Sequence, residues 1–133
     1  MNSGNEWLVD AEGCSADALR DLNTIRRLCD AIVEDLSLKV LGDPIWHKFG
    51  GEGGVTGLYL LTESHLACHT YPETGTATFN LYCCHPRPSW SWEIQLKRLI
   101  GAARVNVRVI GRGSKPEATI GEQSVIVRTV KNT

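Results

Sequence analysis

A serine, two histidines and two carboxylates lie within eleven residues near the centre of the chain: Glu63, Ser64, His65, His69 and Glu73. A hydroxyl can act as a nucleophile, an imidazole can move protons near neutral pH, and an ionised carboxylate offers hydrogen-bond acceptors only. Any one of these residues alone is typical of an ordinary strand or turn. Their combination indicates nucleophilic and acid–base chemistry in this stretch.

Two neighbouring thiols, Cys83 and Cys84, follow one predicted strand later, next to His85. A thiol whose pKa is tuned by its surroundings can transfer a proton. Side chains alternate along a strand, so the two thiols should point to opposite faces of a sheet. No CxxC or HxxxH pair accompanies them, and we therefore expect no metal site.

The elements that must position these side chains can be predicted from hydrophobic periodicity. Apolar residues recur at helical spacing over residues 16–36, after Ser15 as a helix N-cap, and again over 89–100, where Gly101 closes the helix. The predicted strands cover residues 7–11, 39–49, 55–62, 64–71, 76–84 and 104–110.

This order of elements predicts an α+β fold, a two-layer sandwich with an antiparallel β-sheet and two helices on one face. The other face of the sheet is then open to a dimer partner or a site. Residues 114–133 form a C-terminal extension in which 123–130 could add an edge strand.

Composition favours a small-molecule or protein partner for a single domain spanning residues 1–133. The chain has 14 basic and 15 acidic residues and a formal charge of −1, which provides no positive field for nucleic acid or anionic lipid. It shows neither an apolar run long enough to span a bilayer nor the layout of a secretory signal, so we expect a cytoplasmic protein.

The central motifs together resemble the short bacterial and archaeal S-adenosylmethionine decarboxylases. The resemblance is carried by the Glu63-Ser64-His65 step, by a second histidine five residues after the serine, by Tyr71-Pro72-Glu73, and by a cysteine one strand later. It extends more loosely over residues 5–113. No single motif is diagnostic, but their order and spacing are specific.

The resemblance implies that the chain cuts itself between Glu63 and Ser64, into residues 1–63 and 64–133. The serine hydroxyl would attack the Glu63 carbonyl, and elimination would convert Ser64 into a covalent pyruvoyl group, the cofactor. The family's other catalytic residues match His69 as the processing base, Cys84 as the proton donor to the substrate, and Thr56 as a hydroxyl that helps processing. Cys83 is the alternative to Cys84.

Three residues match or approximate the family's substrate contacts. Glu73 matches the carboxylate that binds the ribose hydroxyls, and Phe49 resembles the aromatic that stacks on adenine or the sulfonium. Trp7 is a further aromatic candidate. For His65, a role in the chemistry and a role in packing or hydrogen bonding remain equally open.

Three departures from the family pattern touch the same region. Thr56 replaces a serine, Tyr71 replaces a tryptophan, and an extra glycine lengthens the loop after Phe49. These changes make the substrate less certain than the cofactor.

The leading hypothesis is an enzyme that decarboxylates S-adenosylmethionine for spermidine synthesis, as a homodimer or larger oligomer with two subunits around each pyruvoyl group. One alternative keeps the cofactor and changes the substrate to ornithine or arginine. Another is an unprocessed, non-catalytic homologue that regulates an active subunit. The retained Glu73 and Phe49 favour the nucleoside substrate.

Overall fold

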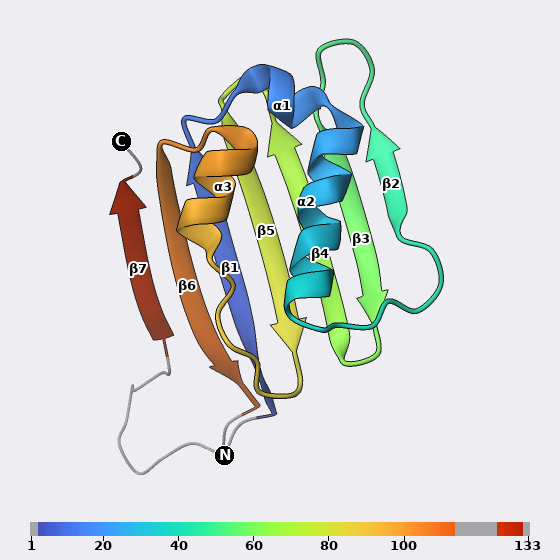
Figure 1. Ribbon diagram of the computed structural model, residues 1–133, viewed down its shortest axis with the longest axis vertical. Helices are drawn as coiled ribbons and strands as arrows, with labels where there is room; N and C mark the ends of the chain where they lie inside the picture. The colour runs from blue at the N-terminus through green and yellow to red at the C-terminus, as the bar shows by residue number, and fades with distance from the viewer. Residues whose placement is uncertain (1–2, 114–124, 132–133) are drawn as a thin grey trace.

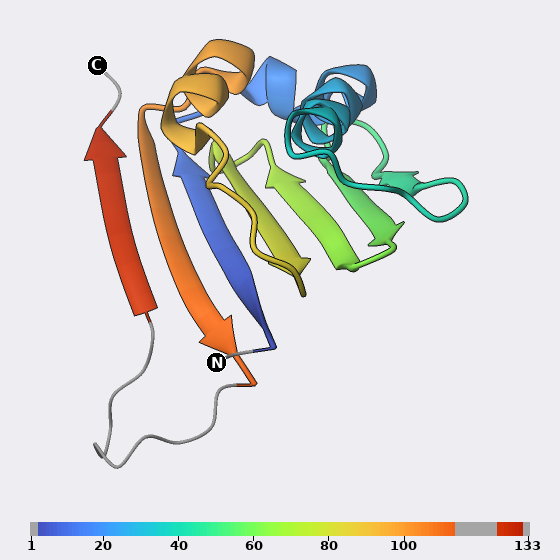
Figure 2. The ribbon, with the colours of Figure 1, turned by 60° about the horizontal axis from the view of Figure 1, so that its bottom comes forward.

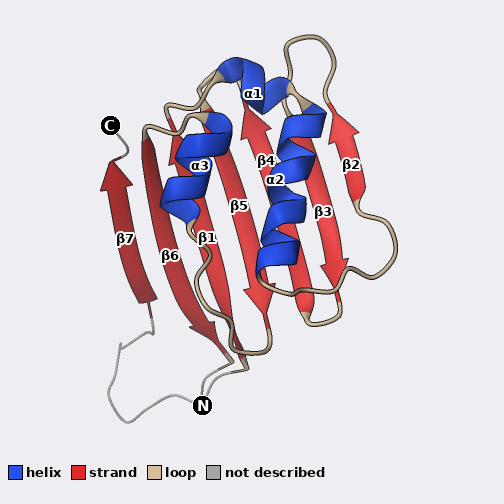
Figure 3. Cartoon of the chain, viewed as in Figure 1, coloured by secondary structure: helices blue, strands red, loops and turns tan. Residues whose placement is uncertain are grey.

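A computed structural model describes residues 3–113 and 125–131, which form an antiparallel sheet covered on one face by helices (Figures 1 and 3). Across these residues the strands are ordered β2-β3-β4-β5-β1-β6-β7. The strands are β1 (Gly4–Glu12), β2 (Ile45–Lys48), β3 (Val55–Leu61), β4 (Ser64–Tyr71), β5 (Thr76–Cys83), β6 (Arg104–Arg112) and β7 (Val125–Lys131). The helices are α1 (Ala16–Arg20), α2 (Leu22–Asp35) and α3 (Trp92–Ile100). The predicted α+β class and two-layer arrangement are confirmed.

The first predicted helix is divided into α1 and α2 at Asp21, so three helical segments replace the two expected. Ser15 caps α1 as predicted, accepting a hydrogen bond from the Ala18 backbone N–H. The Asp21 carboxylate accepts from the backbone N–H of Thr24 at 3.2 Å and from its hydroxyl at 2.5 Å. Asp21 therefore acts as the N-cap of a new helix, because its side chain accepts from the backbone N–H of Thr24 in the first turn of α2.

The second predicted helix begins later than expected, at Trp92, because Trp90 before it is buried in the core outside the helix. Trp90 and Trp92 are buried against each other edge to face, with ring centres 5.0 Å apart. The Trp90 indole N–H also donates to Asp35 at the end of α2, at 2.8 Å. Gly101 ends α3 in the left-handed conformation, as predicted.

The strand predicted over residues 39–49 is reduced to β2, with Val40 making only an isolated bridge to Leu61. Asp43 and Pro44 interrupt the segment, and proline cannot donate to a ladder. The predicted strands over 55–62, 64–71 and 76–84 correspond to β3, β4 and β5 within one residue at each end.

Alternation along the strands separates a buried face from an open one. Val9, Leu66 and Phe79 are buried beneath the helices, whereas their neighbours along each strand face away from them. Figure 2 shows the helices gathered on one side of the sheet and the other side uncovered. We call this uncovered side the open face.

The C-terminal extension contributes β7, which pairs antiparallel with β6 and becomes the edge strand that the sequence suggested without naming its neighbour. Residues 114–124 of the extension lie outside the described part. Among the described residues, no helix is both long and apolar enough to cross a membrane.

Candidate active site

The predicted cleavage site lies in the tight turn between β3 and β4, at the lower end of the sheet in Figure 1. Leu61 pairs with Ser64, so only Thr62 and Glu63 form the loop. Two-residue hairpins normally take positive φ angles inside the loop. Here neither loop residue does, and the positive φ, 142°, falls on Ser64. A side-chain-bearing residue in this region is strained, by about 1–3 kcal/mol, and such strain tends to mark functional positions.

The carbonyl of the Glu63–Ser64 bond already accepts a hydrogen bond. The backbone N–H of Cys84 donates to the Glu63 oxygen at 3.0 Å. If the Ser64 hydroxyl attacks this carbonyl, negative charge develops on the same oxygen. A fixed N–H donor there stabilises that charge as an oxyanion hole does.

The Glu63 side chain is anchored by a partner that was not predicted from the sequence, Arg87. Its carboxylate is only 12% exposed and accepts from Arg87 Nη2 at 2.5 Å, with His85 Nδ1 at 3.9 Å. The second carboxylate oxygen, Oε1, is buried with no hydrogen-bond partner among the described residues. An unmatched buried acceptor costs about 1–3 kcal/mol, so a second unfavourable feature lies at this turn. The position of Arg87, three residues after Cys84, was the only signal in the sequence.

The two neighbouring thiols separate as strand alternation predicts. Cys83 is fully buried on the helix-covered face, and burial raises its pKa to about 11. Cys84 is exposed just after β5, with its sulfur 3.5 Å from His85 Nδ1. Exposure and the contact with the Glu63 carbonyl favour Cys84 over Cys83 as the reactive thiol. We call Glu63, Ser64 and Cys84 the cleavage end.

The predicted base and its partner face each other on neighbouring strands. Thr56 of β3 pairs with His69 of β4, and Thr56 Oγ1 lies 3.1 Å from His69 Nδ1. Both side chains are half-buried on the open face. When Nδ1 carries the proton and donates it to Thr56, Nε2 remains as the basic nitrogen.

Phe49 lies at the same end of the sheet as this pair, at the start of the glycine-rich loop between β2 and β3. It is 49% exposed and packs edge to face on His47, with ring centres 4.5 Å apart. His47 is itself the cross-strand neighbour of Thr56. An exposed aromatic ring beside polar strand residues is suited to stack on a planar or cationic ligand.

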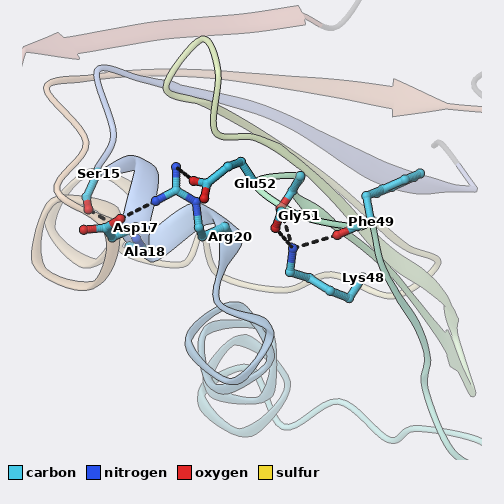
Figure 4. A network of polar contacts seen from close by, with 9 residues as sticks. Ser15, Asp17, Ala18, Arg20, Lys48, Phe49, Gly51 and Glu52 are labelled. Carbon is cyan, nitrogen blue, oxygen red and sulfur yellow. Dashed lines mark hydrogen bonds and ion pairs between the residues drawn. The ribbon is translucent and has the colours of Figure 1, made fainter.

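The loop that carries Phe49 is held by hydrogen bonds from Lys48 and by an ion pair, as Figure 4 shows. Lys48 Nζ donates to the carbonyls of Phe49 at 2.7 Å and Gly53 at 2.6 Å, and more distantly to that of Gly51 at 3.4 Å. Arg20 of α1 reaches across to Glu52 at 2.9 Å. An ammonium group with its three donors engaged limits the conformations of the loop.

Glu73 lies in the turn between β4 and β5, at the same end of the sheet, and is exposed. Pro72 beside it is buried, and the turn is closed by backbone hydrogen bonds from Thr74 to Tyr71 and from Gly75 to Pro72. The carboxylate is thus free to meet a ligand. We call Thr56, His69, Phe49 and Glu73 the histidine end.

The two ends lie far apart within one chain. Ser64 is the first residue of β4, and His69 is five residues further along it. At the rise of an extended strand, their Cα atoms are about 16 Å apart. One chain by itself therefore does not bring the predicted base to the predicted cleavage site.

Trp7, predicted as a further aromatic candidate for substrate contact, lies apart from these residues. It is 4% exposed and part of the hydrophobic core, on the helix-covered face of β1. An even-numbered neighbour would have faced the other way, because alternation along β1 points odd-numbered residues into the core.

The strained Ser64, the N–H donor on the Glu63 carbonyl and the distant pair of His69 and Thr56 lie on one antiparallel sheet and define a candidate enzyme site. Comparison with known proteins gives this class a family. Residues 5–113 match the sequence profile described as S-adenosylmethionine decarboxylase. The chain therefore belongs to the S-adenosylmethionine decarboxylase family.

Individual relatives agree. The chain is similar to the S-adenosylmethionine decarboxylase proenzyme of Moorella thermoacetica, at 31% identity over 83% of this chain and 87% of that one. The proenzyme of Pelotomaculum thermopropionicum is 29% identical over 90% and 94%. The crystal structure of the adenosylmethionine decarboxylase from Aquifex aeolicus superposes with a TM-score of 0.73 at 29% identity, covering 89% of this chain and 97% of that one.

Proposed function

We propose that this chain is a proenzyme that cuts itself between Glu63 and Ser64 and then decarboxylates S-adenosylmethionine. The enzyme class, a carboxy-lyase, follows from the family, and the relatives named above do not point to ornithine or arginine. The observation that carries the cleavage step is the strained Ser64, whose preceding carbonyl accepts the Cys84 N–H. In the family's biology the product supplies spermidine synthesis.

The residues present fit the covalent pyruvoyl cofactor because they suit its formation. Ser64 Oγ attacks the Glu63 carbonyl carbon and passes its proton to a base, and the peptide C–N bond breaks to leave an ester and a free amine. A base then removes the Ser64 α-proton, Glu63 departs as a carboxylate, and water releases ammonia. When present, the resulting ketone withdraws electrons from a substrate amine as carbon dioxide leaves.

The chain's remaining residues would bind substrate and move protons. Phe49 stacks on the adenine or sulfonium, and Glu73 accepts from the ribose hydroxyls. Cys84 holds the proton returned to the product carbon. His69, with its Nδ1 hydrogen-bonded by Thr56, serves as the base for elimination.

These roles require a second copy of the chain. A twofold axis parallel to the open face and perpendicular to the strands stacks two copies face to face with their strands antiparallel, so the cleavage end of one can meet the histidine end of the other. The open face also exposes large apolar side chains near β2 and β3: Ile45 is 70%, Leu60 60% and Leu58 50% exposed. A second copy packed on this face would cover them.

Intact-mass measurement tests the proposal. Freshly purified protein incubated at neutral pH should give fragments of 63 and 70 residues, the larger beginning with a carbonyl that borohydride reduces. Ser64→Ala should stay uncut, and Thr62→Ala is the matched control at the same turn that should still cleave. A wild-type chain that stays in one piece would support the regulatory homologue instead.

Assay of carbon dioxide release then identifies the substrate. Processed enzyme should release it from S-adenosylmethionine and not from ornithine or arginine. Activity on either amino acid alone would contradict the assignments of Glu73 and Phe49.

A further inference from the structure

A row of polar side chains crosses the open face next to the cleavage end. It runs over four neighbouring strands, from His65 on β4 to Asn80 on β5, Glu6 on β1 and Arg112 on β6. These side chains alternate with core residues along their strands, which places them away from the helices. None of them is used in the chemistry described above.

The chemistry of these groups determines which one donates and which one accepts in each hydrogen bond of the row. Asn80 Nδ2 donates to Glu6 Oε2 at 2.6 Å, since an ionised carboxylate can only accept. The amide oxygen of Asn80 must then face the other way, where His65 Nε2 lies 3.1 Å from it. A carbonyl oxygen also only accepts, so His65 Nε2 must carry a hydrogen.

Glu6 is well placed to remain ionised at the end of the row. Its side chain is 15% exposed and forms an ion pair with Arg112 Nη1. Burial alone would raise the pKa of Glu6, but the hydrogen bonds from Asn80 and Arg112 and the charge of Arg112 outweigh it and hold the pKa below its ordinary value.

The residues that pair with His65 on the two neighbouring strands are uncharged. Tyr82 packs edge-on against the imidazole at 5.9 Å and receives the Arg112 guanidinium 5.6 Å from its own ring centre. On β3, the residue paired with His65 is Leu60, which is apolar. Glu6 and Arg112 are therefore the charged groups that face His65 across the sheet.

We propose that Glu6 and Asn80 are positioning residues that hold His65 as the Nε2–H tautomer, with Nδ1 as an acceptor for the substrate's ammonium group. The inference rests on the proposed function, because cleavage before Ser64 leaves the pyruvoyl group on the backbone nitrogen of His65. An imidazole presenting an N–H at that point would repel the ammonium group, whereas a bare Nδ1 accepts a hydrogen bond from it.

Imidazole NMR tests the tautomer without any need for processing. Long-range ¹H–¹⁵N spectra of the uncut Ser64→Ala chain should show His65 with its proton on Nε2 alone. Adding Glu6→Gln should produce a mixture, because a glutamine amide can donate to Asn80 as well as accept from it. Glu12→Gln is the matched control, since Glu12 pairs with Arg104 across the same two strands. A proton on Nδ1 in the parent, or equal spectra for the two glutamine variants, would overturn the inference.

A double variant that exchanges the acid and the amide should restore the tautomer of His65. In Glu6→Gln combined with Asn80→Asp, the new amide can donate to the new carboxylate, which still faces His65 as an acceptor. The Nε2–H tautomer should return in this double variant. If the folded double variant did not restore the Nε2–H tautomer, the hydrogen bonds of the row would not control the tautomer of His65.

Kinetics of the processed enzyme test the role toward substrate. Glu6→Gln should raise KM for S-adenosylmethionine about fivefold with little change in kcat, about 1 kcal/mol of binding, and the paired exchange should lower KM again. Unchanged KM would overturn the substrate role. A chain that never cleaves would overturn that role together with the proposed function, while the NMR spectra would still decide the tautomer.

Discussion

The cleavage end and the histidine end share strand β4 but are built differently. At the cleavage end, backbone constraint dominates: Ser64 has a φ of 142°, and the Glu63 carbonyl is bound by the Cys84 N–H. At the histidine end, side chains dominate, with His69 beside Thr56 and Phe49 on a loop held by charges. The cleavage end constrains the peptide bond between Glu63 and Ser64. The histidine end carries the side chains proposed to move protons and to bind the substrate. In the proposed dimer, each chain would therefore contribute two half-sites.

The largest effect is expected when the two ends are separated on different chains. His69→Ala and Ser64→Ala should each stay uncut alone. When they are co-expressed, random pairing should allow up to about half of the His69→Ala chains to be cut, because each mixed dimer contains one complete site. Mass spectrometry with one variant tagged measures this.

The same experiment can contradict the split arrangement. His85 lies near Cys84 and Glu63 in the same chain, and His85→Ala is the matched variant. If His85→Ala blocks cleavage and His69→Ala does not, the base belongs to the cleavage end. Absence of cleavage in the mixed sample would also exclude a shared site.

The second-largest expected effect distinguishes the roles of the neighbouring thiols of Cys83 and Cys84. Cys84→Ala should lower kcat by about 10²–10⁴-fold, the range expected for loss of a general acid. Cys83→Ala should retain activity and lower the free energy of unfolding by about 1 kcal/mol, because it removes only a buried atom. Steady-state kinetics and urea unfolding measure both, and a reversed pattern would assign the acid to Cys83.

The third effect concerns ligand contacts at the histidine end. Phe49→Ala and Glu73→Gln should each raise KM about tenfold while cleavage remains, since a contact of this kind contributes about 1–2 kcal/mol. Tyr71→Phe, which keeps the ring beside Pro72, is the control. If cleavage slows in step with binding, the two residues act in processing as well.

The smallest effect is in stability. At pH 7, Glu6→Gln should lower the free energy of unfolding by about 1 kcal/mol, more than Glu12→Gln, because Glu6 is far less exposed than Glu12. The folded-state pKa of Glu6 lies below the ordinary value of 4.5, so its contribution is present above that pH. As the pH falls through the lowered pKa the contribution is lost, so the stability difference between Glu6→Gln and its parent should shrink as the pH is lowered below 4.5.

Local patterns in the sequence predicted most of the elements correctly. Helix caps at Ser15 and Gly101 and the alternation in β3, β4 and β5 depend on residues close in the chain. The break at Asp21 was missed because Asp21 lies within a continuous helical period, and its capping hydrogen bonds appear only in three dimensions. The burial of Trp7 was not predicted for a related reason, since the face of the sheet on which a side chain is buried depends on which elements cover that face.

Most element types and the motif that identifies the family could be predicted from the sequence, because both depend on the spacing of residues within one helix, strand or turn. The strain at Ser64, the ion pair between Arg87 and Glu63, and the distance along β4 between the cleavage end and the histidine end appear only in the folded chain. Likewise, the row from His65 to Glu6 joins residues that the sequence separates widely. Strand pairing and register bring such groups together, and those depend on how the whole sheet packs.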